Sequence, residues 1–344
     1  MNNATTSYAS FRPEWLARRR EEILEPELPI IDPHHHLFDR PVHGTYMMPE
    51  LLADLASGHN VLATVFVEWM SMYRADGPVE LRPVGEIEFA NGAAAMSASG
   101  NYGKTRACAG IVGHAELTLG SGVAKVLEAM IVAGCGRLRG VRFISASDPE
   151  QPLWGGVVTR PQGLLLDRHV REGFAQLAPL GLSFDTFVFH PQLGDVVELA
   201  RAFPGTQICL DHVGAPIGVG RFQGKRDAVF AEWSKSIREL AACPNVHVKL
   251  GGMGMKLFGF AFHEGELPPS SEQLAAAWRP YVETCIEAFG TKRAMFESNF
   301  PVDKASYSYG VYWNACKLLA KGMSPAEKAD LFHGTASRFY RLGL

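Results

Sequence analysis

The chain has 344 residues, 47% of them hydrophobic, and its 33 basic and 36 acidic side chains give a formal net charge of -3. This near balance, with no stretch that concentrates lysine and arginine, argues against a nucleic-acid partner or a membrane-surface partner. The polar start and the absence of an 18-residue apolar run indicate neither a signal peptide nor a transmembrane helix, so we expect a cytoplasmic protein.

The cysteines are widely spaced and never form a CxxC motif. They are Cys108, Cys135, Cys209, Cys243, Cys285 and Cys316. Several lie inside apolar patterns, which favours buried thiols in a reducing compartment over a zinc-thiolate site or a disulfide.

Strand and helix patterns alternate along nearly the whole chain. Residues 1–27 are predicted to be a polar leader with a short helix at 13–25, and the first strand begins near Ile30. Further strands are predicted at 61–67, 106–112, 138–144, 182–189, 206–210, 246–250 and 294–296. Helices are predicted from about residue 49 and at 123–133, 167–178, 194–203, 228–241, 271–289 and 325–340.

This alternation predicts the fold class. Strands that alternate with helices imply right-handed crossovers and a parallel sheet, and eight such units close into a (β/α)8 TIM barrel. An open doubly wound sheet is the alternative, but no GxGxxG motif follows the first strand. Nothing indicates a second domain, so we expect residues 28–344 to form one α/β barrel.

Three consecutive histidines end the first predicted strand. Because side chains alternate along a strand, His34 and His36 should point the same way, roughly 6 to 7 Å apart. Two imidazoles at that spacing can hold one metal ion or one anionic substrate. A polar loop is the alternative interpretation; an affinity tag is not, because the run is internal and follows an apolar strand.

Polar side chains also stand at the C-terminal ends of the other predicted strands. They are Glu68, His114, Arg142, His190, His212, Lys249, Glu297 and Asn299. One histidine or arginine in such a place is often a structural group. So many on one rim, where barrel enzymes keep their chemistry, predict an active site.

Taken together, these motifs resemble the amidohydrolase-2 branch of the amidohydrolase superfamily. They are IDPHHHLFD at 31–39, FD at 184–185, HPQL at 190–193, LDHVGAP at 210–216, PNV at 244–246, VKLGG at 248–252 and MFESNFPVD at 295–303. The resemblance covers residues 28 to 340. It is most similar to the group of lactonases that includes fuconolactonase and 2-pyrone-4,6-dicarboxylate lactonase.

The resemblance implies a distorted (β/α)8 barrel that hydrolyses an ester or lactone with activated water, commonly on a carboxylate substrate. In the superfamily the HxH motif binds a divalent metal, which the lactonase group holds weakly or dispenses with. One zinc or manganese ion, or no metal at all, is therefore expected. By position, His34 and His36 match the HxH motif, His212 matches the strand-six histidine, and Asn299 matches the strand-eight aspartate.

Asn299 departs from the family pattern, in which that aspartate is a metal ligand and general base. An amide cannot act as a base at neutral pH and is a poor substitute for an anionic ligand. Glu297 projects to the same face two residues earlier and is the first candidate for the missing carboxylate, as base or as metal ligand, with Asn299 bonding the substrate. Asp303 is the second candidate. Alternatively, Glu297 pairs with Lys249 or Arg142 inside the barrel.

The remaining rim residues suggest how a substrate would be held. Arg142 and Lys249 could bind a carboxylate or stabilise an oxyanion, and His190 or His212 could carry a proton to a leaving alkoxide. We place Glu68 and Asp303 at the substrate site as well. The loop at 68–74 mixes aromatic, thioether and basic side chains, and is expected to be either a substrate wall or ordinary loop packing.

The sequence thus predicts a hydrolase of a small, anionic lactone or carboxylic ester. A metal-dependent decarboxylase of the same family is an alternative, although those enzymes keep the strand-eight aspartate that Asn299 replaces. A catalytically inactive, ligand-binding barrel is another alternative. Analogy with such barrels also suggests a homodimer.

Overall fold

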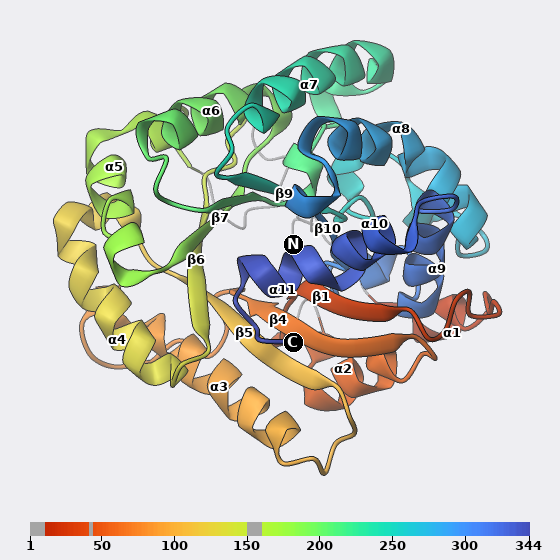
Figure 1. Ribbon diagram of the computed structural model, residues 1–344, viewed down its shortest axis with the longest axis horizontal. Helices are drawn as coiled ribbons and strands as arrows, with labels where there is room; N and C mark the ends of the chain where they lie inside the picture. The colour runs from red at the N-terminus through yellow and green to blue at the C-terminus, as the bar shows by residue number, and fades with distance from the viewer. Residues whose placement is uncertain (1–10, 41–43, 150–159) are drawn as a thin grey trace, which may run out of the picture.

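Eight parallel strands form the centre of the structure, a computed structural model that describes residues 11–40, 44–149 and 160–344 (Figure 1). In sheet order they are β1 (Pro29–His35), β4 (Asn60–Val67), β5 (Arg106–His114), β6 (Leu138–Ile144), β7 (Ser183–Phe187), β8 (Ile208–Leu210), β9 (Val246–Leu250) and β10 (Ala294–Phe296). Each pairs in parallel with the next. The predicted barrel is confirmed. The first ten residues of the predicted leader lie outside the described residues.

The barrel closes between β1 and the segment that follows β10. Asn299 N donates to His34 O at 3.0 Å, and His36 N donates to Phe300 O at 2.8 Å. A single parallel bridge, between His35 and Phe300, joins the two segments there. The closure is therefore irregular, as expected for a distorted barrel, and it lies at the C-terminal ends of the strands.

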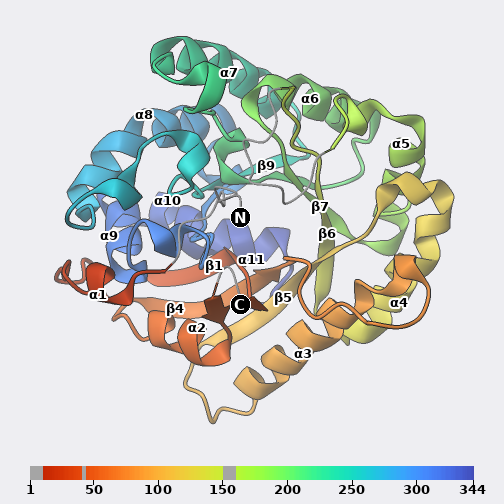
Figure 2. The same cartoon turned by 180° about the vertical axis from the view of Figure 1, so that it is seen from behind.

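Helices surround the ring of strands in both views, except α11 (Thr335–Phe339), which lies across it (Figures 1 and 2). The surrounding helices are α2 (Met48–Leu55), α3 (Val84–Ala98), α4 (Ala124–Gly134), α5 (Arg168–Phe174), α6 (Leu193–Ala202), α7 (Arg226–Ala241), α8 (Ser271–Phe289), α9 (Tyr309–Leu319) and α10 (Pro325–Ala329). A short antiparallel hairpin of β2 (Phe38–Arg40) and β3 (Gly44–Tyr46) follows β1. The sequence patterns predicted no range for helices α3 and α9.

The first helix is shorter than predicted. Helix α1 spans only Pro13–Leu16, whereas the sequence pattern predicted a helix at 13–25. Beyond it, Arg18 Nη1 donates to Glu266 O at 3.0 Å and Arg19 Nε donates to Pro268 O at 3.1 Å. These contacts with a distant loop hold the segment in a non-helical path, so tertiary bonding overrides local propensity.

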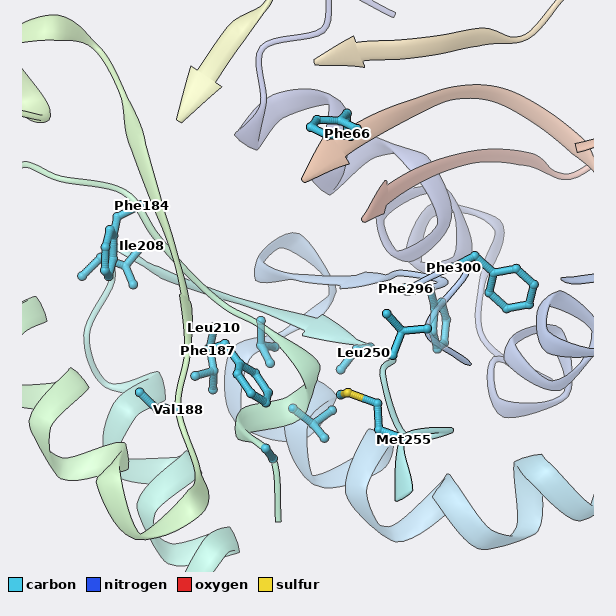
Figure 3. Close-up of a cluster of buried hydrophobic side chains, with 14 of the residues drawn as sticks. Phe66, Phe184, Phe187, Val188, Ile208, Leu210, Leu250, Met255, Phe296 and Phe300 are labelled. Atoms are coloured by element: carbon cyan, nitrogen blue, oxygen red, sulfur yellow. The ribbon is translucent and has the colours of Figure 1, made fainter. Parts of the chain in front are cut away.

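Two apolar layers fill the fold. The outer layer lies between strands and helices, and Figure 3 shows part of it, including Phe184, Ile208 and Leu210 from neighbouring strands. The inner layer lies inside the barrel and consists of Ile31, Ala63, Val65, Val67, Val112, Cys209, Met295, Ala336, Phe339 and Tyr340. The last three residues come from α11 and its C-terminal end, and α11 lies across the ring in Figure 1. One end of the barrel is thus closed by apolar side chains.

An irregularity in β1 sets which histidines face the interior. Ile31 belongs to the inner layer, whereas Asp32 accepts hydrogen bonds from the hydroxyl groups of Ser298, at 2.6 Å, and Tyr309, at 2.9 Å. The register against β4 then shifts between Asp32 and His35. Beyond the shift, His34 faces the interior and His35 faces outward. A bulge of this kind changes which face each following side chain meets.

The segment Leu117–Gly134 is long and apolar enough, by composition alone, to cross a membrane. In the structure it is a 3₁₀ segment that kinks at Gly120, followed by α4. Val126, Leu127 and Met130 of α4 are buried in the outer apolar layer. The segment therefore has the pattern of an outer helix of the barrel.

His35 should make folding stability depend on pH. Burial lowers the pKa of His35 to about 4, so between pH 6.5 and 4 the unfolded chain binds more protons than the folded chain. Stabilisation is thus lost as the pH falls through this window. Between pH 7 and 4.5, the unfolding free energy of the parent should fall by about 2 to 3 kcal/mol more than that of His35→Gln, which lacks the imidazole. Urea denaturation at the two pH values measures this difference.

Thr64→Val is the matched control, because Thr64 Oγ1 lies 2.8 Å from His35 Nε2. This variant loses the same hydrogen bond but keeps the imidazole, so its pH dependence should match that of the parent. Equal pH dependence in all three proteins would contradict a buried, neutral His35.

Candidate active site

Glu297 is the centre of a buried cluster at the C-terminal end of the barrel. It follows β10, and its carboxylate lies 2.7 Å from His34 Nδ1 and 2.6 Å from His212 Nδ1. The backbone N–H of His212 also donates to it, at 3.1 Å. Burial alone would raise the pKa of Glu297, but His212 and His34 hold it well below its usual value. Its ion-pair partners among the described residues are these two imidazoles, not Lys249 or Arg142, the alternative considered from the sequence.

Lys249, on β9, brings a positive charge into the middle of the barrel. Its Nζ lies 2.6 Å from Asp185, 3.0 Å from Asp211 and 3.1 Å from His34 Nδ1. Tyr340 donates a further hydrogen bond to Asp185 at 2.5 Å. Burial would lower the pKa of Lys249, but the charges of Asp185 and Asp211 raise it above its usual value. The ammonium group therefore stays charged.

Arg142, on β6, holds the other side of His34. Its Nε donates to the Glu68 carboxylate at 2.8 Å and its Nη2 donates to Glu68 O at 2.6 Å. Its Nη1 lies 3.3 Å from His34 Nε2. Since a guanidinium only donates, the contact at Nε2 favours a lone pair there, while Nδ1 faces both an acceptor, Glu297 at 2.7 Å, and a donor, Lys249 at 3.1 Å. Burial, together with the charge of Lys249, keeps the pKa of His34 well below its usual value.

His36 and Asn299 face each other beside this cluster. The His34 and His36 rings lie 4.9 Å apart, edge to face. His36 Nδ1 bonds to Val67 O at 2.8 Å, and its Nε2 lies 3.4 Å from Asn299 Oδ1. Asn299 Nδ2 donates to Asp303 at 3.0 Å. Burial raises the pKa of Asp303 to about 6. The Asp303 carboxylate thus turns the amide of Asn299 so that its carbonyl oxygen faces His36.

Two other histidines of the predicted rim lie at its margin. The Ile217 N–H donates to His190 Nδ1 at 3.2 Å, and the His190 ring lies 4.8 Å from the Phe222 ring. Burial lowers the pKa of His190 to about 4. His114 is half-buried, with Nδ1 3.4 Å from Arg142 O. His190, which follows β7, is therefore held by the loop after β8, while His114 adjoins the strand that carries Arg142.

Sequence reasoning did not assign Asp185 or Asp211 to the site. Both are fully buried, and Asp185 lies in the middle of β7. A carboxylate inside an apolar strand was the available signal, because a buried charge requires a partner. The partner, Lys249, is 64 residues away from Asp185 in the sequence. Nothing local in the sequence identifies that pairing.

The donor atoms around Glu297 fit one divalent metal ion. Ligand atoms of His34, His212 and Glu297 all lie within 4.8 Å of one another, and two imidazoles with a carboxylate form a common zinc-binding set. The ion pairs of the cluster also involve four carboxylates, of Glu68, Asp185, Asp211 and Glu297, against the two cations Arg142 and Lys249. A divalent ion would offset that excess of negative charge. The similar group Asp185, Cys209 and Asp211 already has Lys249 among its carboxylates.

Comparison with known proteins shows the family of this chain. The amidohydrolase family profile matches residues 31–342, which is nearly the entire barrel. The chain belongs to the amidohydrolase family. This amidohydrolase is also 32% identical to an uncharacterized protein, y4mH, of Sinorhizobium fredii, over 92% of this chain and 99% of the relative.

Other matches are more limited. The amidohydrolase is 32% identical to an L-fucono-1,5-lactonase of Burkholderia multivorans over 181 residues, 51% of this chain. The chain spans 57% of the length of that lactonase. Among solved structures, a zinc-bound amidohydrolase of B. multivorans matches with a TM-score of 0.67 at 24% identity, over 91% of this chain and 99% of the other. This likeness shows the fold alone.

The metal-binding interpretation predicts that Glu297→Gln binds zinc or manganese more weakly. The substitution keeps the shape but removes the negative charge that faces both imidazoles, so we expect affinity to fall at least about tenfold, as second-shell changes alone can do. Equilibrium dialysis with elemental analysis measures the affinity. Glu272→Gln, on the exposed first turn of α8, is the control and should bind as the parent does. Equal metal affinity in all three proteins would exclude Glu297 as a ligand.

Proposed function

We propose that this amidohydrolase hydrolyses a small lactone or carboxylic ester with activated water. The bridge of Glu297 between His34 Nδ1, at 2.7 Å, and His212 Nδ1, at 2.6 Å, is the observation that carries the proposal. It places an ionised carboxylate and two imidazoles at the end of the barrel where such folds keep their chemistry. The similarity to L-fucono-1,5-lactonase over half of the chain supports an ester within a ring as the substrate group.

In this proposal His212 accepts the proton from water. A proton on His212 Nδ1 donates to Glu297, which leaves the lone pair on Nε2 available as a general base. Glu297 stabilises the charged ring that forms, as carboxylates do in other carboxylate–histidine pairs. The protonated ring then returns its proton to the leaving alkoxide, so His212 serves both halves of the reaction.

Arg142 is the proposed donor to the ester carbonyl. Its two bonds to Glu68 fix the plane of the guanidinium, and its Nη1 lies 3.3 Å from His34 Nε2. A carbonyl oxygen bound beside His34 is then within reach of an N–H that is already oriented. One such donor to a developing oxyanion is worth about 3 to 4 kcal/mol.

A divalent metal, when held by His34, His212 and Glu297, supplies a Lewis acid that polarises a carbonyl and acidifies water. These three side chains are thus both the proposed proton network and the proposed ligand set. Assays before and after chelation distinguish the two, because only the ligand set makes turnover depend on added zinc or manganese.

The expectation of an anionic substrate stays a prediction. Both cations of the cluster already contact carboxylates, Arg142 with Glu68 and Lys249 with Asp185 and Asp211. A substrate carboxylate would have to share them, whereas a neutral ester carbonyl needs only one N–H. Lactones that differ only in a carboxylate substituent test this point through their relative kcat/KM.

Arg142→Lys tests the proposed function most directly. Lysine keeps the charge but lacks the planar guanidinium, which bonds Glu68 and reaches His34 at the same time. We expect kcat/KM for lactone hydrolysis, followed by proton release, to fall about 100-fold or more. Arg139→Lys is the control, since Arg139 lies on the same strand near its N-terminal end and bonds Gly136.

Three results would contradict the proposal. Equal loss of activity in the two variants would indicate a general effect on the fold and no role for Arg142 as donor. Release of carbon dioxide from aromatic carboxylates without lactone hydrolysis would favour the decarboxylase alternative. No turnover on either class of compound, with thermal stabilisation by a carboxylate, would favour the inactive, ligand-binding barrel.

A further inference from the structure

A cavity of about 360 Å³ opens beside the cluster at the C-terminal rim. It is lined by residues of the loops that follow β4 and β5, by the segment before α3, and by Ile144 and Arg160. Volumes of this order are typical of sites for small molecules and are too small for a folded partner. The cavity therefore suits part of a substrate.

Glu68 connects this cavity with the proposed chemistry. It lines the cavity, and its carboxylate lies 2.8 Å from Arg142 Nε. Arg142 Nη1 in turn lies 3.3 Å from His34 Nε2. One residue pair thus separates the cavity from the imidazole that contacts Glu297. Glu68 is thus the lining residue through which a ligand in the cavity would adjoin the buried Arg142.

Most of the exposed surface of the lining is apolar, although Glu68, Tyr73, Glu80, His114, Glu116 and Arg160 also line the cavity. The apolar part comes from Met70, Val79, Pro83, Leu119 and Ile144. Val79 is 70% exposed and Leu119 is 41% exposed, which leaves large apolar side chains uncovered around one opening. Uncovered apolar side chains gathered at a cavity mark a binding surface more often than single ones do.

Two of the charged side chains in the lining neutralise each other. Arg160 Nη1 lies 3.1 Å from the Glu116 carboxylate. Glu116 also accepts a hydrogen bond from Thr118 Oγ1 at 2.8 Å. A charged substituent of the substrate would therefore compete with an existing ion pair, whereas an alkyl or aryl group leaves that pair intact.

The wall formed by the loop after β4 is held in place by hydrogen bonds to Glu86 and by packing against α3. Glu86 Oε1 accepts the backbone N–H groups of Trp69 and Ser71, both at 2.8 Å. A Cβ at Gly85 would lie 2.5 Å from Met72 O, so the start of α3 packs directly against the loop. Binding then costs little ordering of the wall, which raises affinity.

We infer that the substrate carries an alkyl or aryl substituent that fills this cavity while its ester group lies at Arg142 and His34. The inference rests on the proposed function and specifies its substrate class. A polyhydroxylated sugar lactone fits this lining less well, because each hydroxyl group placed against Met70, Leu119 or Ile144 loses its hydrogen bonds to water without replacement.

The inference can be tested with a series of γ-butyrolactones. Each carries a linear alkyl group, from methyl to hexyl, on the γ-carbon of the ring, which bonds the ring oxygen. Each methylene buried in the cavity should raise kcat/KM by about threefold to fourfold until the cavity is full. L-Fucono-1,5-lactone is the polar comparator and should be hydrolysed less efficiently than the longer members. A kcat/KM independent of chain length, or highest for the sugar lactone, would overturn the inference.

Leu119→Asp links the effect to the cavity. A carboxylate at this exposed position should reduce the increase in kcat/KM to less than about twofold for each methylene, because the charge brings water to the apolar lining. Leu267→Asp is the matched control, since Leu267 is 45% exposed and does not line the cavity. It should keep the chain-length dependence of the parent. If kcat/KM rose equally with chain length in both variants, the alkyl group would bind elsewhere.

A binding measurement separates this inference from the proposed function. Cyclopentanones with the same alkyl groups keep the ring and the carbonyl but lack the ester oxygen. If no lactone is hydrolysed, the proposed function fails, yet a melting temperature that rises with alkyl length and is lost in Leu119→Asp still supports the apolar cavity. The absence of any chain-length dependence in both assays would exclude the cavity as a binding site.

Discussion

The requirement that buried charges be paired governs the C-terminal half of this barrel. Lys249, inside the ring of strands, contacts two carboxylates and the ring of His34. Arg142 fulfils the same requirement with Glu68. Loss of one partner would leave an isolated charge in an apolar interior, which costs several kcal/mol. These pairs fix the positions of the imidazoles and so couple the geometry of the site to the stability of the fold.

The division of the barrel interior explains why the charged and imidazole side chains gather at one end only. The end across which α11 lies is filled by aliphatic and aromatic side chains, and Tyr340 extends from there to Asp185. Above that layer the inward positions change to charged and imidazole side chains. The apolar layer keeps water from reaching the ion pairs through the end of the barrel that α11 crosses. The low dielectric that results strengthens the interaction of Glu297 with His34 and His212.

The sequence predicted the fold well and the site in part. The eight strands were predictable because apolar runs of parallel strands are continuous, and His34, His36 and Glu297 could be placed on one rim by alternation. Glu297 was expected within reach of His34, but its contact with His212 could not be predicted, because that contact depends on the tilt of strands that are distant in sequence. Similarly, the 13–25 pattern favoured a helix, and only the loop carbonyls that bond Arg18 and Arg19 explain why α1 stops at Leu16.

The shift of register in β1 has a further consequence for the run of three histidines. A strand presents every second residue to the interior, so a slip of one position would exchange the inner and outer sets. With the shift in place, His34 faces Glu297 while His35 faces Thr64 outside the ring. A slip would leave His35 as the one histidine of the run that faces inward and would point His34 and His36 toward the surrounding helices. Inserting or deleting one residue near Pro33 would therefore change the number of imidazoles in the barrel while changing its apolar composition little.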